Sequence, residues 1–142
     1  MIKFFLKKKD IPSINPLVDV YNCVSMETRL SIGAHDLGKL NGNVTLRMTT
    51  GEEYFLPLGS SGAEKIHAGE YCYVDDGNEV VCRLECRQSN KTKIDQQTEN
   101  CLIIVQGNEY TSDNVILSTA HRLVNLVRQY CGGERGQFFF YS

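Results

Sequence analysis

The chain has 142 residues, 42% of them hydrophobic, and a formal net charge of −2. These values are typical of one globular domain and exclude an intrinsically disordered chain. No apolar run reaches the ~20 residues of a membrane span. Lys7–Lys9 follow residues 1–6, which are apolar apart from Lys3, and this reverses the charge order of a signal peptide. We therefore expect a single cytoplasmic domain over residues 1–142.

Six cysteines raise the question of disulfides and metal binding, and none of them belongs to a C-x-x-C pair. Most are flanked by apolar or strand-like residues, which suits free thiols that pack as small hydrophobes. Zinc is the alternative, with Cys72, Cys82, Cys86 and His67 as its ligands. A spacing of four along a strand separates Cys82 from Cys86 by roughly 13 Å, too far to share one ion. We expect no metal and no cofactor.

Positive charge is concentrated in two places along the chain. Between Arg83 and Lys93 there are four cations against Glu85 alone, and Lys7–Lys9 form a second group. Such runs are ordinarily solvated surface. The alternative is a local and weak contact with nucleic acid, because affinity grows with each phosphate that is neutralised.

The first predicted element is a helix from Pro16 to about Thr28. Asn15 suits its N-cap, and Pro16 suits the first helical position, where a missing N–H costs nothing. Its buried face is expected to consist of residues that recur at helical spacing, namely Leu17, Val20, Tyr21 and Val24. A short turn that contains His35 is expected after this helix.

The middle of the chain predicts strands. Alternation indicates a strand over 44–48 and a second over 54–56, which Pro57 ends. Segments 70–74 and 80–84 flank Asp-Asp-Gly-Asn, a sequence that favours the tight turn of a hairpin. The polar residues 88–100 predict a long loop.

The last part of the chain predicts a strand and a helix. The apolar residues 102–105 indicate a short buried strand, and residues 137–141 a terminal strand or an exposed sheet edge. Ser112 or Asp113 caps the final helix, which Gly132 and Gly133 end. Its expected buried stripe is Val115, Ile116, Ala120, Leu123, Val124, Val127 and Tyr130. A helix, a run of strands and a final helix indicate the α+β class.

Several sequence motifs of enzymes are absent, including the G-x-S-x-G elbow and both glycine-rich phosphate-binding loops. Three histidines remain for acid–base chemistry. His67 in a loop and His121 in the final helix are more simply surface residues. His35 differs because it lies between Gly33-Ala34 and Asp36, in the predicted turn.

Five segments, in this order, resemble the editing, or tRNA-binding, domain of the phenylalanyl-tRNA synthetase beta subunit. They are Asn15–Asn22, Ser31–Leu40, Gly42–Arg47 with Gly51-Glu52, Tyr71–Asp76, and Thr98–Ile103. The segment Cys82–Ser89, with Lys91-Thr92, is closer to the free-standing relatives of that domain, which occur outside any synthetase.

The resemblance implies an α+β domain with a β-sandwich-like sheet of unusual topology and flanking helices. It implies a protein that binds the aminoacylated 3′ end of tRNA and hydrolyses a mischarged ester in trans. The alternative is a non-catalytic module, derived from that domain, that binds RNA or a protein. Two departures separate the chain from the synthetases: their histidine falls on Gly33, and their later carboxylate falls on Ile104. Their specificity for tyrosine is therefore not carried over.

Candidate site residues follow from this comparison. His35 is the candidate base, and Asn22 and Asp36 would orient it or bind the amino group of the substrate. The remaining polar candidates would bind substrate; they are Arg47, Arg87, Gln88, Ser89, Asn90, Lys91 and Thr92. We expect Asn22, His35, Asp36, Arg47, Arg87 and Gln88 to line one cleft.

Free-standing relatives carry more sequence ahead of the first helix, so we expect this chain to lack the N-terminal part of the domain. Loss of that part would expose apolar surface, which monomers rarely leave open over more than a few hundred Å². The uncharged residues 138–141 add a segment that can pair as an edge strand. A two-fold homodimer is therefore expected.

The cysteine pattern generates a direct test. We predict that all six cysteines of the native protein are reduced and bind no metal. Titration of thiols in denaturant should return six per chain, and metal analysis should return none. One stoichiometric zinc ion would contradict this prediction.

Overall fold

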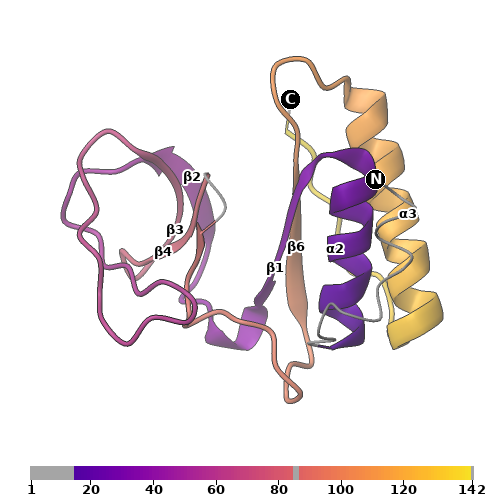
Figure 1. Cartoon of the computed structure of the whole chain (residues 1–142), viewed down its shortest axis with the longest axis horizontal. Coiled ribbons are helices and arrows are strands. Elements are labelled where there is room, and N and C mark those ends of the chain that lie inside the picture. Colours follow the sequence, from indigo (N-terminus) through magenta and orange to yellow (C-terminus); the bar gives the residue numbers. More distant parts are fainter. Residues whose placement is uncertain (1–14, 85–86, 142) are drawn as a thin grey trace. The chain divides into compact units, whose positions relative to one another are not determined.

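The computed structural model describes residues 15–84 and 87–141. Two compact units divide the chain: residues up to Gly33 and from Ile104 form the first, and Ala34–Ile103 form the second. β1 (Ser31–Asp36) and β6 (Cys101–Gln106) form a two-stranded sheet (Figure 1). The structure divides the chain into these two units, and the single domain expected over residues 1–142 stays a prediction.

Helix α2 (Pro16–Thr28) confirms the predicted bounds, but Leu17 and Val20 of its expected buried face are only half-buried. The side chain of Asn15 caps it by accepting the Val18 N–H at 2.9 Å. One face is buried through Val18, Tyr21 and Val24. Arg29 ends the helix in the left-handed region, with φ 59°, and donates its N–H to the Ser25 carbonyl at 2.8 Å.

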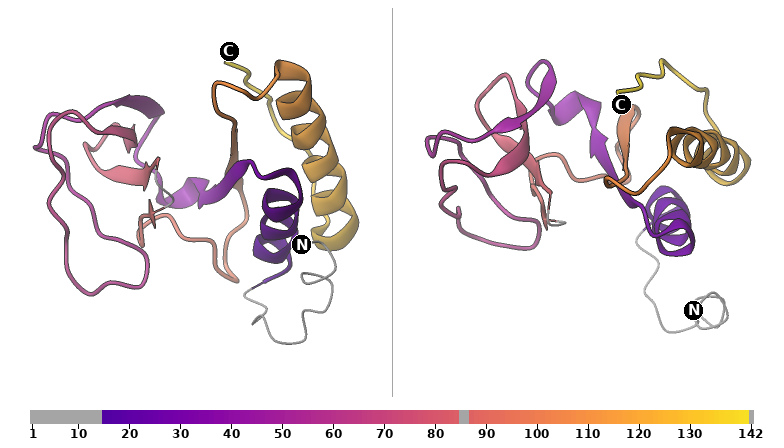
Figure 2. Two further views of the ribbon diagram at one scale, coloured as in Figure 1. Left: turned by 45° about the horizontal axis from the view of Figure 1, so that its top comes forward. Right: turned by 90° about the horizontal axis from the view of Figure 1, so that it is seen from above.

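Helix α3 (Asp113–Cys131), capped by Ser112, packs against α2 (Figure 2). Glu27 and Arg122 form an ion pair between them at 2.5 Å. The predicted stripe is wrong at both ends, because Val115 is 45% and Tyr130 64% exposed. A 13-residue helix covers only part of a 19-residue one. The fully buried positions of α3 are Thr119 and Leu123.

The residues after α3 form no strand, so the predicted terminal strand is wrong within the described part of the chain. Phe138 instead packs edge-on against His121, with ring centroids 5.1 Å apart. The guanidinium of Arg135 lies 4.8 Å from the centroid of the same ring. In the described residues, no helix has both the length and the apolar character to cross a membrane.

The second unit contains a four-stranded antiparallel sheet in the order β2-β3-β4-β5. Its strands are β2 (Val44–Met48), β3 (Tyr71–Asp75), β4 (Val80–Arg83) and β5 (Arg87–Gln88). One buried cluster combines sheet and loop residues: Phe55, Ile66, Cys72, Val74 and Val80. Helices and two sheets together confirm the α+β class.

Two predicted strands differ from the structure, and the predicted hairpin is present. The strand expected over 54–56 is reduced to single bridges, Tyr54 with Glu79 and Pro57 with Ser89. Proline lacks the N–H that would extend the pairing. β4 and β3 flank the predicted turn, in which Asn78 has φ 61°. The strand predicted over 102–105 is present in β6, but its residues are half-buried rather than buried.

His35 lies in β1 and not in a turn, which corrects the sequence prediction. Ala34, His35 and Asp36 are all buried, so the strand continues through the region where a turn was expected. The chain turns in the 3-10 helix η1 (Leu37–Lys39), which starts directly after Asp36. Asp36 caps it by accepting the Gly38 N–H at 2.8 Å.

Two glycines allow the packing of the second unit to be tested. Gly42 and Gly59 have φ of +71° and +79°, but only a Cβ on Gly42 would collide with the carboxylate of Asp76. That carboxylate accepts the Asn43 N–H at 2.8 Å, so it cannot move without losing a hydrogen bond. We predict that Gly59→Ala lowers the free energy of unfolding by about 1 kcal/mol, from φ alone. Gly42→Ala should cost about 2–3 kcal/mol. Equal losses of unfolding free energy in the two variants, measured by chemical denaturation, would contradict the close approach of Gly42 to Asp76.

Candidate functional site

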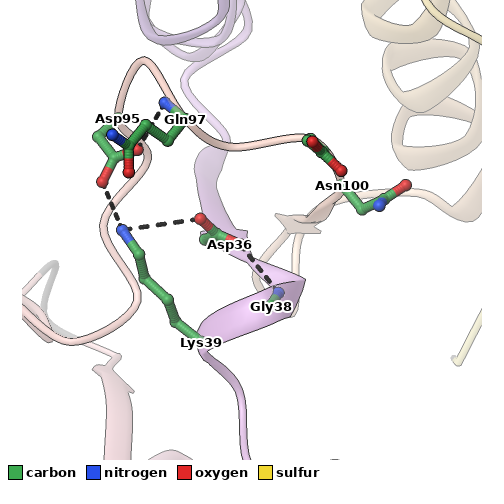
Figure 3. A pocket seen from close by; sticks show the side chains of 7 residues that line it. Asp36, Gly38, Lys39, Asp95, Gln97 and Asn100 are labelled. Carbon is green, nitrogen blue, oxygen red and sulfur yellow. Dashed lines mark hydrogen bonds and ion pairs between the residues drawn. The ribbon is translucent and has the colours of Figure 1, made fainter.

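A hollow of about 300 Å³ lies in the second unit where η1 faces the segment that leads into β6. Every residue that lines it belongs to Ala34–Ile103. Figure 3 shows Lys39 of one segment facing Asp95 of the other, beside Asp36. The lining residues are Asp36, Gly38, Lys39, Asp95, Gln97, Glu99 and Asn100. The lining side chains include three carboxylates and one ammonium group.

Asp36 is the most enclosed group of this wall, at 7% exposure. Besides capping η1, its carboxylate accepts the Thr98 hydroxyl at 2.8 Å. Its backbone N–H donates to the Thr92 carbonyl at 2.9 Å, and the N–H of Leu37 donates to the Asn100 carbonyl at 3.0 Å. These bonds hold the Asp36 carboxylate at the edge of the hollow.

Lys39 reaches from η1 to the opposite wall (Figure 3). Its Nζ lies 2.6 Å from Oδ2 of Asp95 and 3.6 Å from Oδ2 of Asp36. The hydrogen bond with Asp95 raises the pKa of the Lys39 ammonium and lowers the pKa of the Asp95 carboxyl. Both groups are therefore charged at neutral pH.

His35 does not line the hollow, because it is 1% exposed. Its Nδ1 shares a hydrogen bond of 2.8 Å with the hydroxyl of Thr92, which is fully buried. Burial lowers the pKa of the His35 imidazole to about 4. The ring is neutral at pH 7 and is enclosed by protein, so direct contact with a ligand would require a rearrangement.

The predicted substrate-binding residues 88–92 form a segment that we call the brace. Gln88 Nε2 donates to the Ala34 carbonyl at 2.9 Å, and Thr92 bonds to His35 and Asp36. Ser89 is fully buried, and the Asn90 N–H donates to the Leu56 carbonyl at 2.8 Å. The brace thus ties β1 to the rest of the second unit.

The three predicted substrate-binding cations already have acidic partners. Arg47 lies 2.7 Å from the buried carboxylate of Glu53. Arg87 contacts Glu64 at 2.9 Å. Lys91 lies 2.9 Å from Glu79 and 3.1 Å from Asp75, and the hydrogen bond with Glu79 raises the pKa of its ammonium.

Asn22 is exposed on α2 and belongs to the first unit, whereas the other cleft candidates belong to the second. The expectation of one cleft for all of them stays a prediction. In residues 15–84 and 87–141, no group of three or more His, Cys, Asp or Glu could hold a metal ion. Cys86, one of the zinc ligands considered, lies outside the described residues. Burial raises the pKa of the Cys72 thiol.

Six residues of the hollow were not singled out from the sequence: Gly38, Lys39, Asp95, Gln97, Glu99 and Asn100. Two features of the sequence pointed to these residues, namely the family resemblance and the length of the polar loop. Lys39 lies in the segment Ser31–Leu40 and Glu99 and Asn100 lie in Thr98–Ile103, both of which carried the family resemblance. Asp95 and Gln97 fall in the long polar loop, whose length alone is typical of a functional segment.

The fold is that of a synthetase fragment. The structure matches an N-terminal fragment of the phenylalanyl-tRNA synthetase beta subunit from Pyrococcus horikoshii with a TM-score of 0.67 and 14% sequence identity. The match covers 81% of this chain and 40% of that one. At this identity the likeness establishes the fold.

The sequence defines the family. Residues 1–132 match the model of the B3/4 domain, so the chain belongs to this family and the expected relationship is confirmed. The phenylalanine–tRNA ligase beta subunit of Photorhabdus laumondii is 30% identical over 98 residues, which cover 69% of this chain and 12% of that protein. The beta subunit of Shewanella oneidensis is 26% identical over 92% of this chain and 19% of its own length. The chain thus spans less than a fifth of these relatives.

The buried imidazole predicts a pH dependence of stability. The pKa of His35 is about 4 in the folded protein against 6.5 ordinarily. Because the folded state binds the proton more weakly, stability is lost as pH falls from about 6.5 towards 4, by up to about 3 kcal/mol. We predict that His35→Gln flattens this dependence between pH 5 and 6.5 in denaturant titrations.

The exposed His67 provides the matched control. His67→Gln should retain the pH dependence of the wild-type protein, whatever its effect on absolute stability. A wild-type slope in His35→Gln would show that another group titrates in this window.

Proposed function

We propose that this chain is a trans-editing domain. It binds the aminoacylated 3′ end of tRNA at the hollow and hydrolyses a mischarged aminoacyl ester. Membership of the B3/4 family supports a domain derived from the synthetase beta subunit. The relatives that it matches are phenylalanine–tRNA ligase beta subunits, whose substrates include tRNA.

One observation carries this proposal: two segments that resemble the synthetase domain meet at one hollow. Asp36, Gly38 and Lys39 come from Ser31–Leu40, and Glu99 and Asn100 come from Thr98–Ile103. The chain separates these segments by more than fifty residues.

The chemistry of the hollow suits an activated ester. Hydrolysis of such an ester needs a positioned water and donors to the oxyanion that develops on the carbonyl oxygen. In this proposal the Asp36 carboxylate orients the water, and the amides of Gln97 and Asn100 act as donors. The carboxylate of Glu99 is available to the α-ammonium group of the substrate.

His35 takes a different place from the one expected for a base. Its burial makes it a positioning residue that acts through Thr92, whose carbonyl accepts the Asp36 N–H at 2.9 Å. The roles expected for Asn22, Arg47, Arg87 and Lys91 stay predictions, as does the homodimer.

A non-catalytic module is the second candidate function. The burial of His35 favours it, because no imidazole is offered to a ligand in the hollow. The second unit, Ala34–Ile103, has seven Lys and Arg against eleven Asp and Glu, a formal net charge of −4. An RNA ligand would therefore be bound by local contacts rather than across a wide basic surface.

Deacylation in trans separates the two functions. A panel of correctly and wrongly charged tRNAs is incubated with the chain, and release of the amino acid is followed. Hydrolysis of one mischarged species above its uncatalysed rate is expected. Binding of an amide-linked aminoacyl-tRNA analogue without turnover of any ester would instead support the module. The absence of both binding and turnover would contradict both candidate functions.

Adjacent glutamines locate the site. Gln97 lines the hollow, whereas Gln96 is exposed and does not line it. We predict that Gln97→Ala weakens binding of the amide-linked analogue by about 5–10-fold, the effect of one or two lost hydrogen bonds. Gln96→Ala should bind as the wild type does. Equal affinities for all three proteins in a fluorescence titration would remove the hollow as the binding site.

A further inference from the structure

Lys39 is the one cation that lines the hollow within the described residues, and its ammonium faces protein oxygens. Nζ donates to Oδ2 of Asp95 at 2.6 Å and to the Lys93 carbonyl at 3.1 Å. Oδ2 of Asp36 lies 3.6 Å away. The donors of this ammonium are therefore engaged within the wall, which leaves little capacity for a phosphate.

The two partners of Lys39 start a segment that builds the far wall of the hollow. Asp95 Oδ1 accepts the Gln97 N–H at 2.8 Å, and the Asp95 N–H donates to the Thr98 hydroxyl at 3.0 Å. That hydroxyl donates in turn to Asp36 at 2.8 Å. Residues 95–98 are thus one hydrogen-bonded turn, and the side chains of Lys39 and Thr98 join it to η1 and to its cap Asp36. Backbone bonds flank the turn, from Asp36 to Thr92 and from Leu37 to Asn100.

We propose that Lys39 is a positioning residue. It holds the 93–98 segment against η1 and so sets the distance between Asp36 and Gln97 across the hollow, without binding the ligand itself. The inference rests on the proposed function for the part that concerns a ligand. Its structural part, the attachment of the segment, stands on the contacts of Lys39 alone.

The ion pair between Lys39 and Asp95 is open to water, which limits its contribution to stability. The side chains of Lys39 and Asp95 are 33% and 38% exposed. Ion pairs so open to water contribute little to global stability and are weakened by salt. Removal of the ammonium should therefore leave the melting temperature almost unchanged and act on the local opening of the 93–98 segment.

Hydrogen exchange measured on the whole chain tests the attachment. Lys39→Met keeps the length of the side chain and removes the charge, and Lys39→Arg restores a cation. The control is Lys65→Met, which removes an exposed lysine outside the hollow. In Lys39→Met, the amides of residues 95–98 should exchange about 3–5-fold faster, the range of an exposed ion pair. Lys39→Arg and Lys65→Met should exchange as the wild type does.

Binding of the amide-linked aminoacyl-tRNA analogue tests the consequence. Affinity should fall about 3–5-fold in Lys39→Met, return in Lys39→Arg and stay unchanged in Lys65→Met. Wild-type exchange or wild-type affinity in Lys39→Met would overturn the inference. Failure of the wild-type protein itself to bind the analogue would contradict the proposed function, while the exchange data would still decide the attachment.

Discussion

The end of strand β1 is held by polar groups that water scarcely reaches. His35 and Thr92 share a hydrogen bond at 1% and 0% exposure, and Thr92 also accepts the N–H of Asp36. Gln88 satisfies the carbonyl of Ala34. A buried polar group left unpaired costs about 1–3 kcal/mol. Strand β1 therefore ends at the position where the brace can pair its buried polar groups. That end point sets the start of η1, and with it the position of Asp36 and Lys39 in the hollow.

Charge pairing is the second constraint on the second unit. Five of its seven basic residues form ion pairs with carboxylates: Lys39, Arg47, Arg83, Arg87 and Lys91. The most enclosed carboxylate is that of Glu53, whose side chain is fully buried beside Arg47. Burial opposes ionisation of Glu53, but hydrogen bonds from Thr50, Arg47 and Gly51 outweigh it and lower the pKa of the carboxyl to about 2. Cations committed in this way shape loops and are poorly placed to collect phosphates. The arrangement suits recognition of a small chemical group better than recognition of an RNA surface.

The candidate site was only partly accessible to sequence reasoning. Asp36 could be found because it follows His35 in a segment that resembles the synthetase domain. Gln88–Thr92 have the composition of a binding loop, and that role stays a prediction. The structure adds that they form the brace, because His35 and Thr92 meet across 57 positions of sequence. Asp95 and Gln97 gave no signal beyond the polarity of their loop. A polar side chain looks alike in sequence whether it faces a ligand or satisfies a buried backbone group.

The features that could be predicted from the sequence alone depend on interactions between residues close together in the chain. The N-caps of both helices, the proline at the start of α2 and the turn between β3 and β4 depend on neighbours within a few residues, so these elements were predictable. The family relationship was also carried by short segments in order. Tertiary structure alone decided that Tyr54–Leu56 forms bridges instead of a strand, that His35 is enclosed, and that Lys39 faces Asp95. Burial and pairing between distant residues are properties of the packed chain, because they depend on which surfaces meet after folding and not on the spacing of residues along it.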